Sequence, residues 1–382
     1  MHERKKILWL VSWYPNKYDP FDGDFIQRHA TAAALLNDVH VLFINQWHGQ
    51  KEIESSLSEI NGLREERIYL PKHQGITGKL QNYREWKHHF RARVKEIIKT
   101  QGPALIHVHV PWKVGLIAVW AKKHFGIPYV VTEHWGIYNE FAKDNIYTKP
   151  FLVRSLLKKI YSQARSFVPV SRFLGEAVNL TLVKKSFTVI PNVVDTTLFR
   201  LSSNKNSTFT FIHISTMADG KNVGGILNAY RRFLETTTIS TQFVFIGNKD
   251  DRYVQRAKSL RLLESVFFKG EISYSDVARE LQKAHCHVLF SKSETFSCVT
   301  AEALCCGVPV IAPQVGALPE LVNNNSGYLI NSNNEEELLK AMHEIVKNYQ
   351  KFNLAGIASA ASQQYNYPVV AEKFDRLYSS IT

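Results

Sequence analysis

The sequence predicts an α/β fold made of two Rossmann-like, doubly wound parallel-sheet domains. Short apolar runs of β character alternate with segments of helical periodicity, the pattern typical of parallel α/β proteins. The polar stretch 202–207 interrupts this alternation, which then starts again. A chain of 382 residues is also long enough for two cores of ordinary size. Two such units are expected to bind a ligand in a cleft where the carboxyl ends of their strands face each other.

Each half of the chain contains its own series of expected elements. In the first half we expect strands at 6–11, 39–45, 104–110, 129–132, 167–170 and 187–190, and helices at 24–36, 82–100, 114–125 and 150–164. In the second half we expect strands at 209–215, 241–246, 266–269, 285–290 and 308–311, with helices between them. The predicted domains are 1–200 and 201–360, followed by a C-terminal helix in 361–382.

The positive charge lies almost wholly in the first half of the chain. Residues 1–200 hold 29 Lys and Arg against 17 Asp and Glu, whereas residues 201–382 hold 18 against 17. The first half therefore carries +12 of the net charge of +13. Such an asymmetry indicates an anionic partner.

The composition indicates a cytoplasmic protein. The apolar stretch 7–11 is too short for a signal peptide and is interpreted as a buried strand. No apolar run approaches the roughly 18 residues that a membrane span needs. A reduced chain without disulfides or a zinc site is expected, because zinc-site spacing is absent among its four cysteines: Cys286, Cys298, Cys305 and Cys306.

The segment 291–330 carries the strongest functional signal. It predicts a loop after a buried strand, a helix that starts near Ser297, and another buried strand. Glu294 in the loop and Glu302 on the helix place two carboxylates around a helix start whose amides attract anions. Carboxylates suit sugar hydroxyls and amides suit a pyrophosphate, so one nucleotide-sugar would satisfy both. The alternative is that Ser293 or Ser297 caps the helix and Glu294 complements its dipole.

This segment resembles the donor-site motif of glycosyltransferase family 4, whose members are retaining enzymes with the GT-B fold. Ala317 stands where a second glycine is usual, and the other motif positions match: Glu294, Glu302, Gly307, Pro309, Val310, Ile311, Gly316, Pro319 and Glu320. The resemblance implies a hexosyltransferase (EC 2.4) whose donor substrate is a nucleotide-diphosphate sugar, with no further cofactor and no metal. It also implies that Glu302 binds the donor ribose and Glu294 the sugar or its phosphate side.

Other segments fall in the order of the same family. Gly23 opens an expected helix, where a glycine permits close approach to a phosphate or is simply a turn residue. His134 ends an expected strand, and the resemblance implies contact with the transferred sugar; the alternative is a core histidine. His107 and His109 are interpreted as structural. The segments 170–173 and 190–195 also resemble family segments, although Val193 replaces a glycine.

A departure lies around Lys221. The family supplies an Arg and a Lys to the donor pyrophosphate, and here Lys221 keeps the Lys whereas Thr216 replaces the Arg. Lys292 or Arg28 is a possible substitute cation, and a solvated Lys221 is the alternative interpretation. The predicted catalytic residues are His134, Lys221 and Glu294, and the predicted donor-binding residues are Gly23, Lys221, Glu294, Phe296, Ser297, Cys298, Val299 and Glu302.

Two basic helical segments, 79–99 and 149–165, combine cations with apolar residues at helical spacing. They suit either an anionic membrane surface or a packed helix with a solvated face. A peripheral position on the inner face of the cell membrane, with a glycan or lipid-linked acceptor, would explain them. Residues 46–100 match nothing in the family, as expected where acceptor specificity is set. The resemblance also implies a C-terminal helix, at 367–378, that returns to the first domain.

Two other classes of function stay open on the sequence alone. A sugar-nucleotide epimerase or a phosphorylase uses the same fold, and the fold does not determine the chemistry. A basic nucleic-acid-binding protein fits the pI of about 9.4. No nucleic-acid-binding motif is present, however, so nucleic acid is not expected as a partner.

Overall fold

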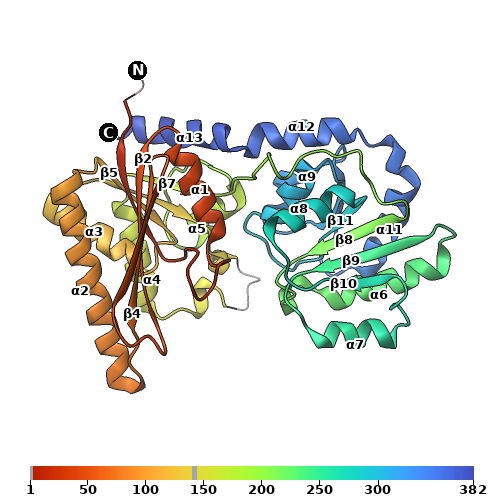
Figure 1. Cartoon of the computed structure of the whole chain (residues 1–382), viewed down its shortest axis with the longest axis horizontal. Helices are drawn as coiled ribbons and strands as arrows, with labels where there is room; N and C mark the ends of the chain where they lie inside the picture. Colours follow the sequence, from red (N-terminus) through yellow and green to blue (C-terminus); the bar gives the residue numbers. More distant parts are fainter. Residues whose placement is uncertain (1–2, 140–143) are drawn as a thin grey trace. The chain divides into compact units, whose positions relative to one another are not determined.

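The computed structural model describes residues 3–139 and 144–382, which form two compact units (Figure 1). Unit 1 contains residues 3–139, 144–193 and 367–382, and unit 2 contains Val194–Asn366. Each unit is built on one sheet flanked by helices, which confirms the predicted class of two doubly wound α/β units. The chain passes between the units at 193–194 and again at 366–367, whereas the sequence placed these limits at 200 and 360.

The sheet of unit 1 has the strand order β3-β4-β2-β1-β5-β6-β7. All neighbouring strands are parallel except β3 and β4, which form an antiparallel hairpin at one edge. The strands are β1 (Lys6–Val11), β2 (Asp38–Trp47), β3 (Glu54–Ile60), β4 (Leu63–Pro71), β5 (Leu105–His109), β6 (Tyr129–Glu133) and β7 (Ser166–Pro169).

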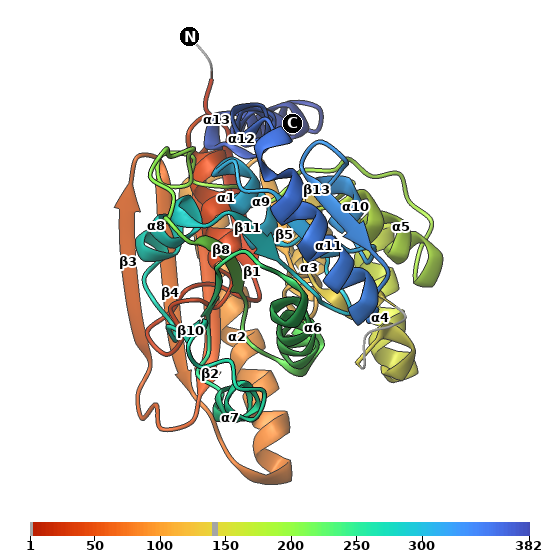
Figure 2. The same ribbon diagram turned by 90° about the vertical axis from the view of Figure 1, so that its right-hand side faces the viewer.

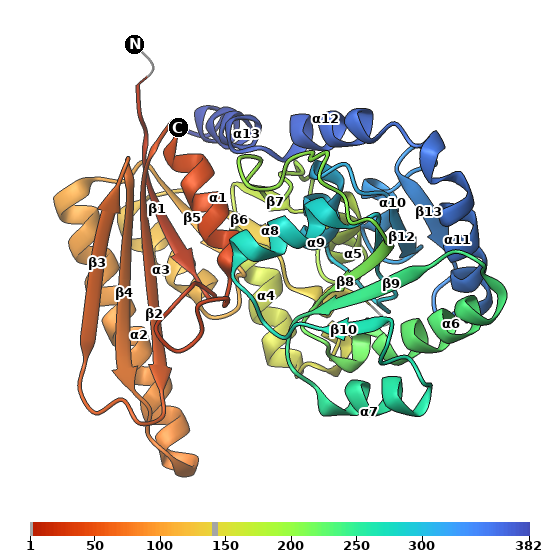
Figure 3. The same ribbon diagram turned by 45° about the vertical axis from the view of Figure 1, so that its right-hand side comes forward.

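Helices cover this sheet from both sides (Figure 3). Alternate residues of β1, Ile7, Trp9 and Val11, share a core cluster with residues of α1 and of the last helix, α13. On the other side α2, α3 and α4 form a row of contacting helices. The helices are α1 (Asp24–Ala34), α2 (Gly75–Gln101), α3 (Val114–Phe125), α4 (Phe151–Gln163), α5 (Arg172–Thr181) and α13 (Tyr367–Ser379), with short 3-10 helices η1 (Gly136–Tyr138) and η2 (Ile146–Thr148).

Helix α13 completes the core of unit 1 although it is distant in sequence. It lies along α1, and Val370, Phe374 and Tyr378 are fully buried in the same cluster as Trp9. The Tyr378 hydroxyl also lies 2.8 Å from a ring nitrogen of His107 on β5. The C-terminal residues are therefore an integral part of unit 1.

The sheet of unit 2 is fully parallel, with the order β10-β9-β8-β11-β12-β13. Helices α6 and α11 lie side by side on one face (Figure 2), and α8, α9 and α12 form another contacting set. The strands are β8 (Phe209–Ile214), β9 (Thr241–Ile246), β10 (Val266–Phe268), β11 (Cys286–Val288), β12 (Val310–Pro313) and β13 (Gly327–Ile330). The helices are α6 (Val223–Thr236), α7 (Asp251–Ser259), α8 (Tyr274–Lys283), α9 (Cys298–Cys305), α10 (Leu318–Leu321), α11 (Glu335–Asn348) and α12 (Leu354–Tyr365), with 3-10 helices η3 (Asp219–Lys221) and η4 (Tyr349–Lys351).

One expected strand does not form. The segment 187–190 makes an isolated bridge between Phe187 and Phe167 and no ladder. The ring of Phe187 instead packs against α5, where it lies 2.6 Å from the position that a Cβ on Gly175 would take. The segment keeps two backbone hydrogen bonds to β7, from Thr188 N–H to Phe167 and from Ile190 N–H to Pro169, but it does not extend into a regular strand. Among the residues that the structure describes, no helix is long and apolar enough to cross a bilayer.

Candidate functional site

The loop between β1 and α1 lies at the carboxyl edge of the sheet in unit 1. Gly23 closes this loop with a φ of 64°, in the left-handed region that favours glycine. A Cβ atom at this position would lie 2.6 Å from the backbone carbon of Trp13. The close packing of the loop is by itself a sufficient reason for glycine, and the role of Gly23 in donor binding stays a prediction.

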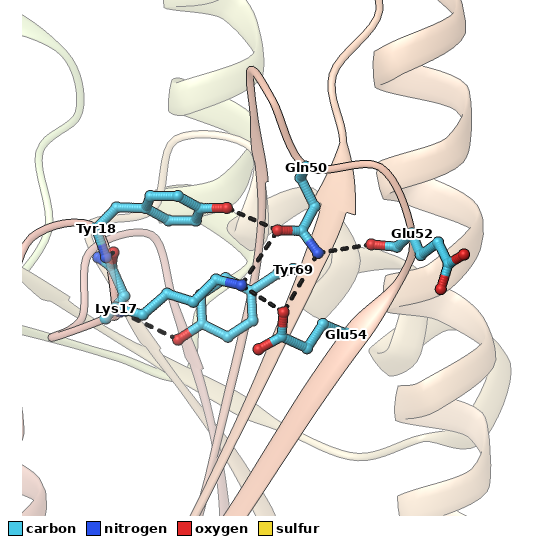
Figure 4. A network of polar contacts seen from close by, with 7 residues as sticks. Lys17, Tyr18, Gln50, Glu52, Glu54 and Tyr69 are labelled. Atoms are coloured by element: carbon cyan, nitrogen blue, oxygen red, sulfur yellow. Dashed lines mark hydrogen bonds and ion pairs between the residues drawn. The ribbon is translucent and has the colours of Figure 1, made fainter.

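A polar network fastens the same loop to the neighbouring strands (Figure 4). The Lys17 ammonium group pairs with the Glu54 carboxylate and lies 3.2 Å from the side-chain oxygen of Gln50. The Tyr18 hydroxyl donates to that same oxygen at 2.6 Å, and the Tyr69 hydroxyl accepts the Lys17 backbone N–H at 3.3 Å. Most of these residues belong to the region 46–100, which contains no motif of the family. No local pattern could have identified the network because its members are far apart in the chain.

His134 follows β6, and its backbone is held by the neighbouring carboxylate of Glu133. One oxygen of Glu133 accepts the N–H groups of His134 and Trp135, both at 2.9 Å, and the other accepts the Tyr161 hydroxyl at 2.5 Å. Burial raises the pKa of Glu133 to about 7, although these hydrogen bonds lower it. The side chain of His134 is buried, and burial lowers its pKa well below the ordinary range. His134 is therefore a neutral imidazole.

Two further histidines lie beside His134. His29 comes from α1 and His109 from the end of β5, and all three side chains are buried. Nδ1 of His109 lies 3.3 Å from Nε2 of His134. The structural interpretation suits His107, because both of its ring nitrogens lie 2.8 Å from hydroxyl groups. His109 instead contacts the predicted catalytic histidine, a contact that its position in the sequence did not indicate.

In unit 2, Lys221 and Glu294 meet at the carboxyl edge of the sheet. Lys221 ends η3 after β8, and Glu294 lies in the loop between β11 and α9. Nζ of Lys221 is 2.5 Å from a carboxylate oxygen of Glu294. The backbone N–H of Lys292 also donates to the carbonyl of Gly220 at 2.8 Å. The two loops are thus joined by main chain and side chain, which brings together two of the predicted catalytic residues.

Thr216, which replaces the expected arginine, is exposed in this region. Lys292 is also exposed, and its loop is bonded to the turn that carries Lys221. Arg28 belongs to unit 1, where it pairs with Asp24 at 2.8 Å. Within unit 2, Lys292 therefore lies in a loop that is bonded to the turn carrying Lys221.

Helix α9 begins at Cys298, directly after a left-handed residue. Ser297 has a φ of 73° and gives no side-chain hydrogen bond to the helix start; its hydroxyl lies 2.9 Å from that of Thr300. The interpretation of Ser297 as an ordinary cap is therefore wrong. Phe296 is buried, whereas Ser297, Cys298 and Val299 are half-buried. Backbone N–H groups at the start of a helix are donors that suit an anion.

The second predicted carboxylate, Glu302, lies on α9 and is only 3% exposed. One of its oxygens accepts the Tyr274 hydroxyl of α8 at 2.8 Å. The loop that carries Gly316 packs on the backbone of Glu294: a Cβ on Gly316, whose φ is 56°, would lie 1.8 Å from the Glu294 carbonyl oxygen. The Ala317 N–H donates to that oxygen at 3.2 Å, so alanine fits where the family usually has glycine.

A cavity of about 380 Å³ lies where β9 and β10 end, close to Met217 in the loop after β8. A Cβ on Gly247, after β9, would lie 1.7 Å from the Ser215 carbonyl oxygen, and the Gly247 N–H donates to the Gly270 carbonyl at 3.0 Å. This cavity was not predicted from the sequence, although a glycine directly after a buried strand was a usable signal. It is lined by Met217, Phe245, Gly247, Asn248, Lys249, Asp250, Val254, Phe268, Lys269 and Gly270. A larger hollow of about 640 Å³ beside α12 contains none of the predicted catalytic or donor-binding residues.

Comparison with known proteins agrees with this architecture. Residues 30–198 match the family described as Glycosyltransferase Family 4, and residues 195–361 match Glycosyl transferases group 1. The chain is 24% identical over 338 residues to the uncharacterized glycosyltransferase MJ1178 of Methanocaldococcus jannaschii, covering 87% of this chain and 88% of that protein. It is 23% identical over 241 residues to the alpha-monoglucosyldiacylglycerol synthase of Streptococcus pneumoniae, covering 58% and 54%. The structure of Anabaena Alr3699/HepE in complex with UDP and glucose superposes with a TM-score of 0.73 at 17% identity, over 99% and 100% of the two chains.

Proposed function

This chain belongs to the group 1 glycosyltransferases of family 4, and on that premise we propose that it is a retaining enzyme that transfers a hexosyl group from a nucleotide-diphosphate sugar to a glycan or lipid-linked acceptor. The observation that carries the proposal is the Lys221–Glu294 pair beside the start of α9. The two curated relatives described above are named as a glycosyltransferase and a synthase of a glucosyl lipid, which favours transfer over epimerisation or phosphorolysis.

The nucleotide would occupy the carboxyl edge of the sheet in unit 2. We assign the base to the cavity at the ends of β9 and β10, because ligands of open α/β sheets bind outside the carboxyl ends of the strands. The ribose would bind Glu302, and the diphosphate would bind the first turn of α9. One protein of similar fold, the Anabaena protein, has been solved in complex with UDP and glucose. A uridine nucleotide is therefore the first donor to test.

In the transfer itself, the bond between the sugar C1 and the diphosphate oxygen breaks, and the oxygen keeps the electron pair. The acceptor oxygen forms the new bond to C1 and gives its proton to the departing diphosphate. Lys221 stabilises the negative charge that develops on the leaving group, with Lys292 as the second cation. His134 would position the sugar as a neutral hydrogen-bonding group. We propose that no metal or other cofactor takes part.

A thermal-shift panel with UDP, GDP, ADP and CMP tests the donor assignment. A nucleotide that binds the native state raises the melting temperature according to its concentration and affinity. We expect one diphosphate to stabilise the wild type and to lose most of this effect in the Glu302→Ala variant. Equal shifts in both proteins, or no shift with any nucleotide, would contradict the proposed site.

The surface of unit 1 supports a peripheral position on an anionic membrane, at the cytoplasmic face. In a parallel α/β layer the helices run opposite to the strands, so the N-terminal ends of α2 and α4 lie toward the carboxyl edge of the sheet. Both ends expose large apolar side chains: Ile76 is 89% exposed and Phe151 is 78% exposed. Leu80 and Leu152 are exposed beside them, within the two basic segments. Exposed apolar residues among cations suit insertion into an anionic lipid surface.

Vesicle co-sedimentation tests the membrane proposal. Wild-type protein should bind vesicles that contain anionic lipid at low salt and be released at high salt, because each Lys or Arg near the surface contributes roughly 1 kcal/mol. The variant with Ile76→Ser and Phe151→Ser should bind weakly. Leu180→Ser is a matched control, since Leu180 is 83% exposed on α5 outside the basic segments. Binding that is independent of lipid charge, or equally weak in the control, would refute the proposal.

A further inference from the structure

Three histidines from three different elements meet inside unit 1. Each ring of His29, His109 and His134 offers a nitrogen, and the three nitrogens lie within 4.8 Å of one another. All three side chains are buried, the most exposed being His134 at 6%. The ring centroids are separated by 6.0, 5.4 and 5.5 Å. Such convergence of neutral imidazoles in a protein interior needs a physical explanation.

The spacing is close to that of three imidazoles on one metal ion. With Zn–N distances of about 2.0–2.1 Å and tetrahedral angles, the ligand nitrogens lie about 3.3 Å apart and the ring centroids about 5.2 Å apart. Nδ1 of His109 and Nε2 of His134 are 3.3 Å apart, and two of the three centroid separations agree within about 0.3 Å. A small inward movement of His29 would complete the set.

The hydrogen bond of His29 selects the ring tautomer that a metal ligand needs. Its Nε2 lies 2.8 Å from the carbonyl oxygen of Pro191, and because a carbonyl can only accept, this nitrogen carries the hydrogen. Nδ1 therefore has a lone pair, and it has no hydrogen-bond partner among the residues that the structure describes. A ligating histidine typically donates its other N–H to a backbone carbonyl in this way.

The protonation states and the remaining nitrogens are also consistent with a ligand set. Burial lowers the pKa of His29 to about 4 and the pKa values of His109 and His134 well below the ordinary range, so all three are in the neutral form that binds metals. When Nδ1 of His109 and Nε2 of His134 bind the ion, the opposite ring nitrogens, Nε2 of His109 and Nδ1 of His134, carry the hydrogens.

We propose that His29, His109 and His134 form a site for one divalent transition metal ion of the zinc class, with a fourth position open, and that the bound ion inhibits sugar transfer. Imidazole nitrogen suits Zn²⁺, Co²⁺, Ni²⁺ and Cu²⁺, whereas Mg²⁺ and Ca²⁺ require oxygen ligands. Inhibition follows because the ion occupies the ring that would position the sugar. This second part rests on the proposed function, whereas metal binding does not.

Cobalt titration tests the site. Tag-free protein, freed of metal with a chelator, should bind one equivalent of Co²⁺ with the visible absorption of a four-coordinate ion. The variant His109→Gln should lose at least about 100-fold in affinity, more than the loss of an outer-shell partner causes. His88→Gln with His89→Gln is the matched control, because these neighbouring histidines of α2 contact each other outside the cluster. Absent bands in the wild type, or unchanged binding in His109→Gln, would overturn the proposal.

Two further measurements keep the test decisive. Should His109→Gln fail to fold by circular dichroism, His29→Gln replaces it, and the wild-type cobalt spectrum decides without any variant. Zn²⁺ should also raise the melting temperature of the wild type, whereas Mg²⁺ should not. Finally, Zn²⁺ should lower transfer reversibly while leaving the UDP-induced thermal shift unchanged. Metal binding without loss of transfer would refute only the inhibitory part of the proposal. If the metal-free protein in chelator transfers no sugar, that result would count against the proposed function instead.

Discussion

The carboxyl edges of the two sheets use opposite chemistry on the same architecture. In unit 1 the part of the edge beside β5 and β6 is formed by buried, neutral imidazoles and by a carboxyl, Glu133, whose pKa burial raises to about 7. In unit 2 the edge carries an ion pair, Lys221 with Glu294, beside lysines that line a cavity. Two parallel sheets with helices on them therefore do not determine the polarity of a site. The loops after the strands do, and here they place buried imidazoles at one edge and an ion pair at the other.

The largest effect, a loss of sugar transfer, is expected on substitution of His134 at the neutral edge of unit 1. His134→Ala should abolish transfer, a loss above the roughly 10³-fold that one electrostatic contact supplies, because the sugar would no longer be positioned. UDP binding should hardly change, since the proposed nucleotide site belongs to unit 2. Parallel measurements of transfer and UDP affinity check this. Full activity in the folded variant would return His134 to a purely structural role.

A smaller kinetic effect is expected on the charged edge. Lys221→Ala should lower kcat by about 10²–10³-fold and weaken donor binding much less, because the charge on the leaving group is fully developed only in the transition state. Lys258→Ala, an exposed lysine of α7, is the control. Steady-state kinetics with varied donor concentration separate the two effects. An intact kcat with a raised KM would make Lys221 a binding residue.

On the neutral edge, Glu133 should make stability depend on pH. Its native pKa of about 7 exceeds the ordinary value of 4.5, so its contribution to stability is full below about pH 4.5 and is lost as the pH rises to about 7. The whole change amounts to at most about 3 kcal/mol. In Glu133→Gln this slope should disappear, so the variant gains stability relative to the wild type between pH 5 and pH 7.5. Thermal unfolding of both proteins across this range measures the difference, and parallel curves would show that Glu133 does not titrate there.

The smallest effect belongs to Glu302. Glu302→Ala should weaken donor binding by about 1–3 kcal/mol, or about 5- to 150-fold in Kd, the cost of losing hydrogen bonds to a charged group. Tyr274→Phe is the informative partner variant, because it removes the hydroxyl that bonds to Glu302 while keeping the carboxylate. Calorimetry with the preferred nucleotide gives both affinities. If the Kd of folded Glu302→Ala is unchanged, the ribose binds elsewhere.

Strands and helices with regular apolar patterns were predictable from the sequence. β1 and β9 have the expected limits because their residues are almost all apolar and lie inside parallel sheets. The hairpin of β3 and β4 was missed, since six of the seven residues of β3 are exposed and both strands carry many charged or polar side chains. Strand β13 was missed because a strand of four residues that begins with a glycine gives little pattern.

The residues of the candidate site also divide into those that a sequence motif predicts and those that only the fold brings together. Glu294 and Glu302 were found because a motif places them near each other in sequence, and Lys221 was found because its segment resembles the one in which the family has an Arg followed by a Lys. The contact of His109 with His134 was missed because it joins two strands, β5 and β6, and both strands are apolar enough that a histidine reads as a core residue. The cavity at β9 and β10 depends on backbone approaches that only the folded chain reveals.

The return of α13 to unit 1 has a consequence for how the protein is made. The core of unit 1 includes Val370 and Phe374, whereas unit 2 is a single continuous segment, Val194–Asn366. During synthesis the nascent chain therefore exposes most of unit 1 first but cannot close its core until all of unit 2 has left the ribosome. Until then the part of the core around Trp9 that α13 covers lacks this helix. Transiently exposed apolar surface of this kind favours aggregation.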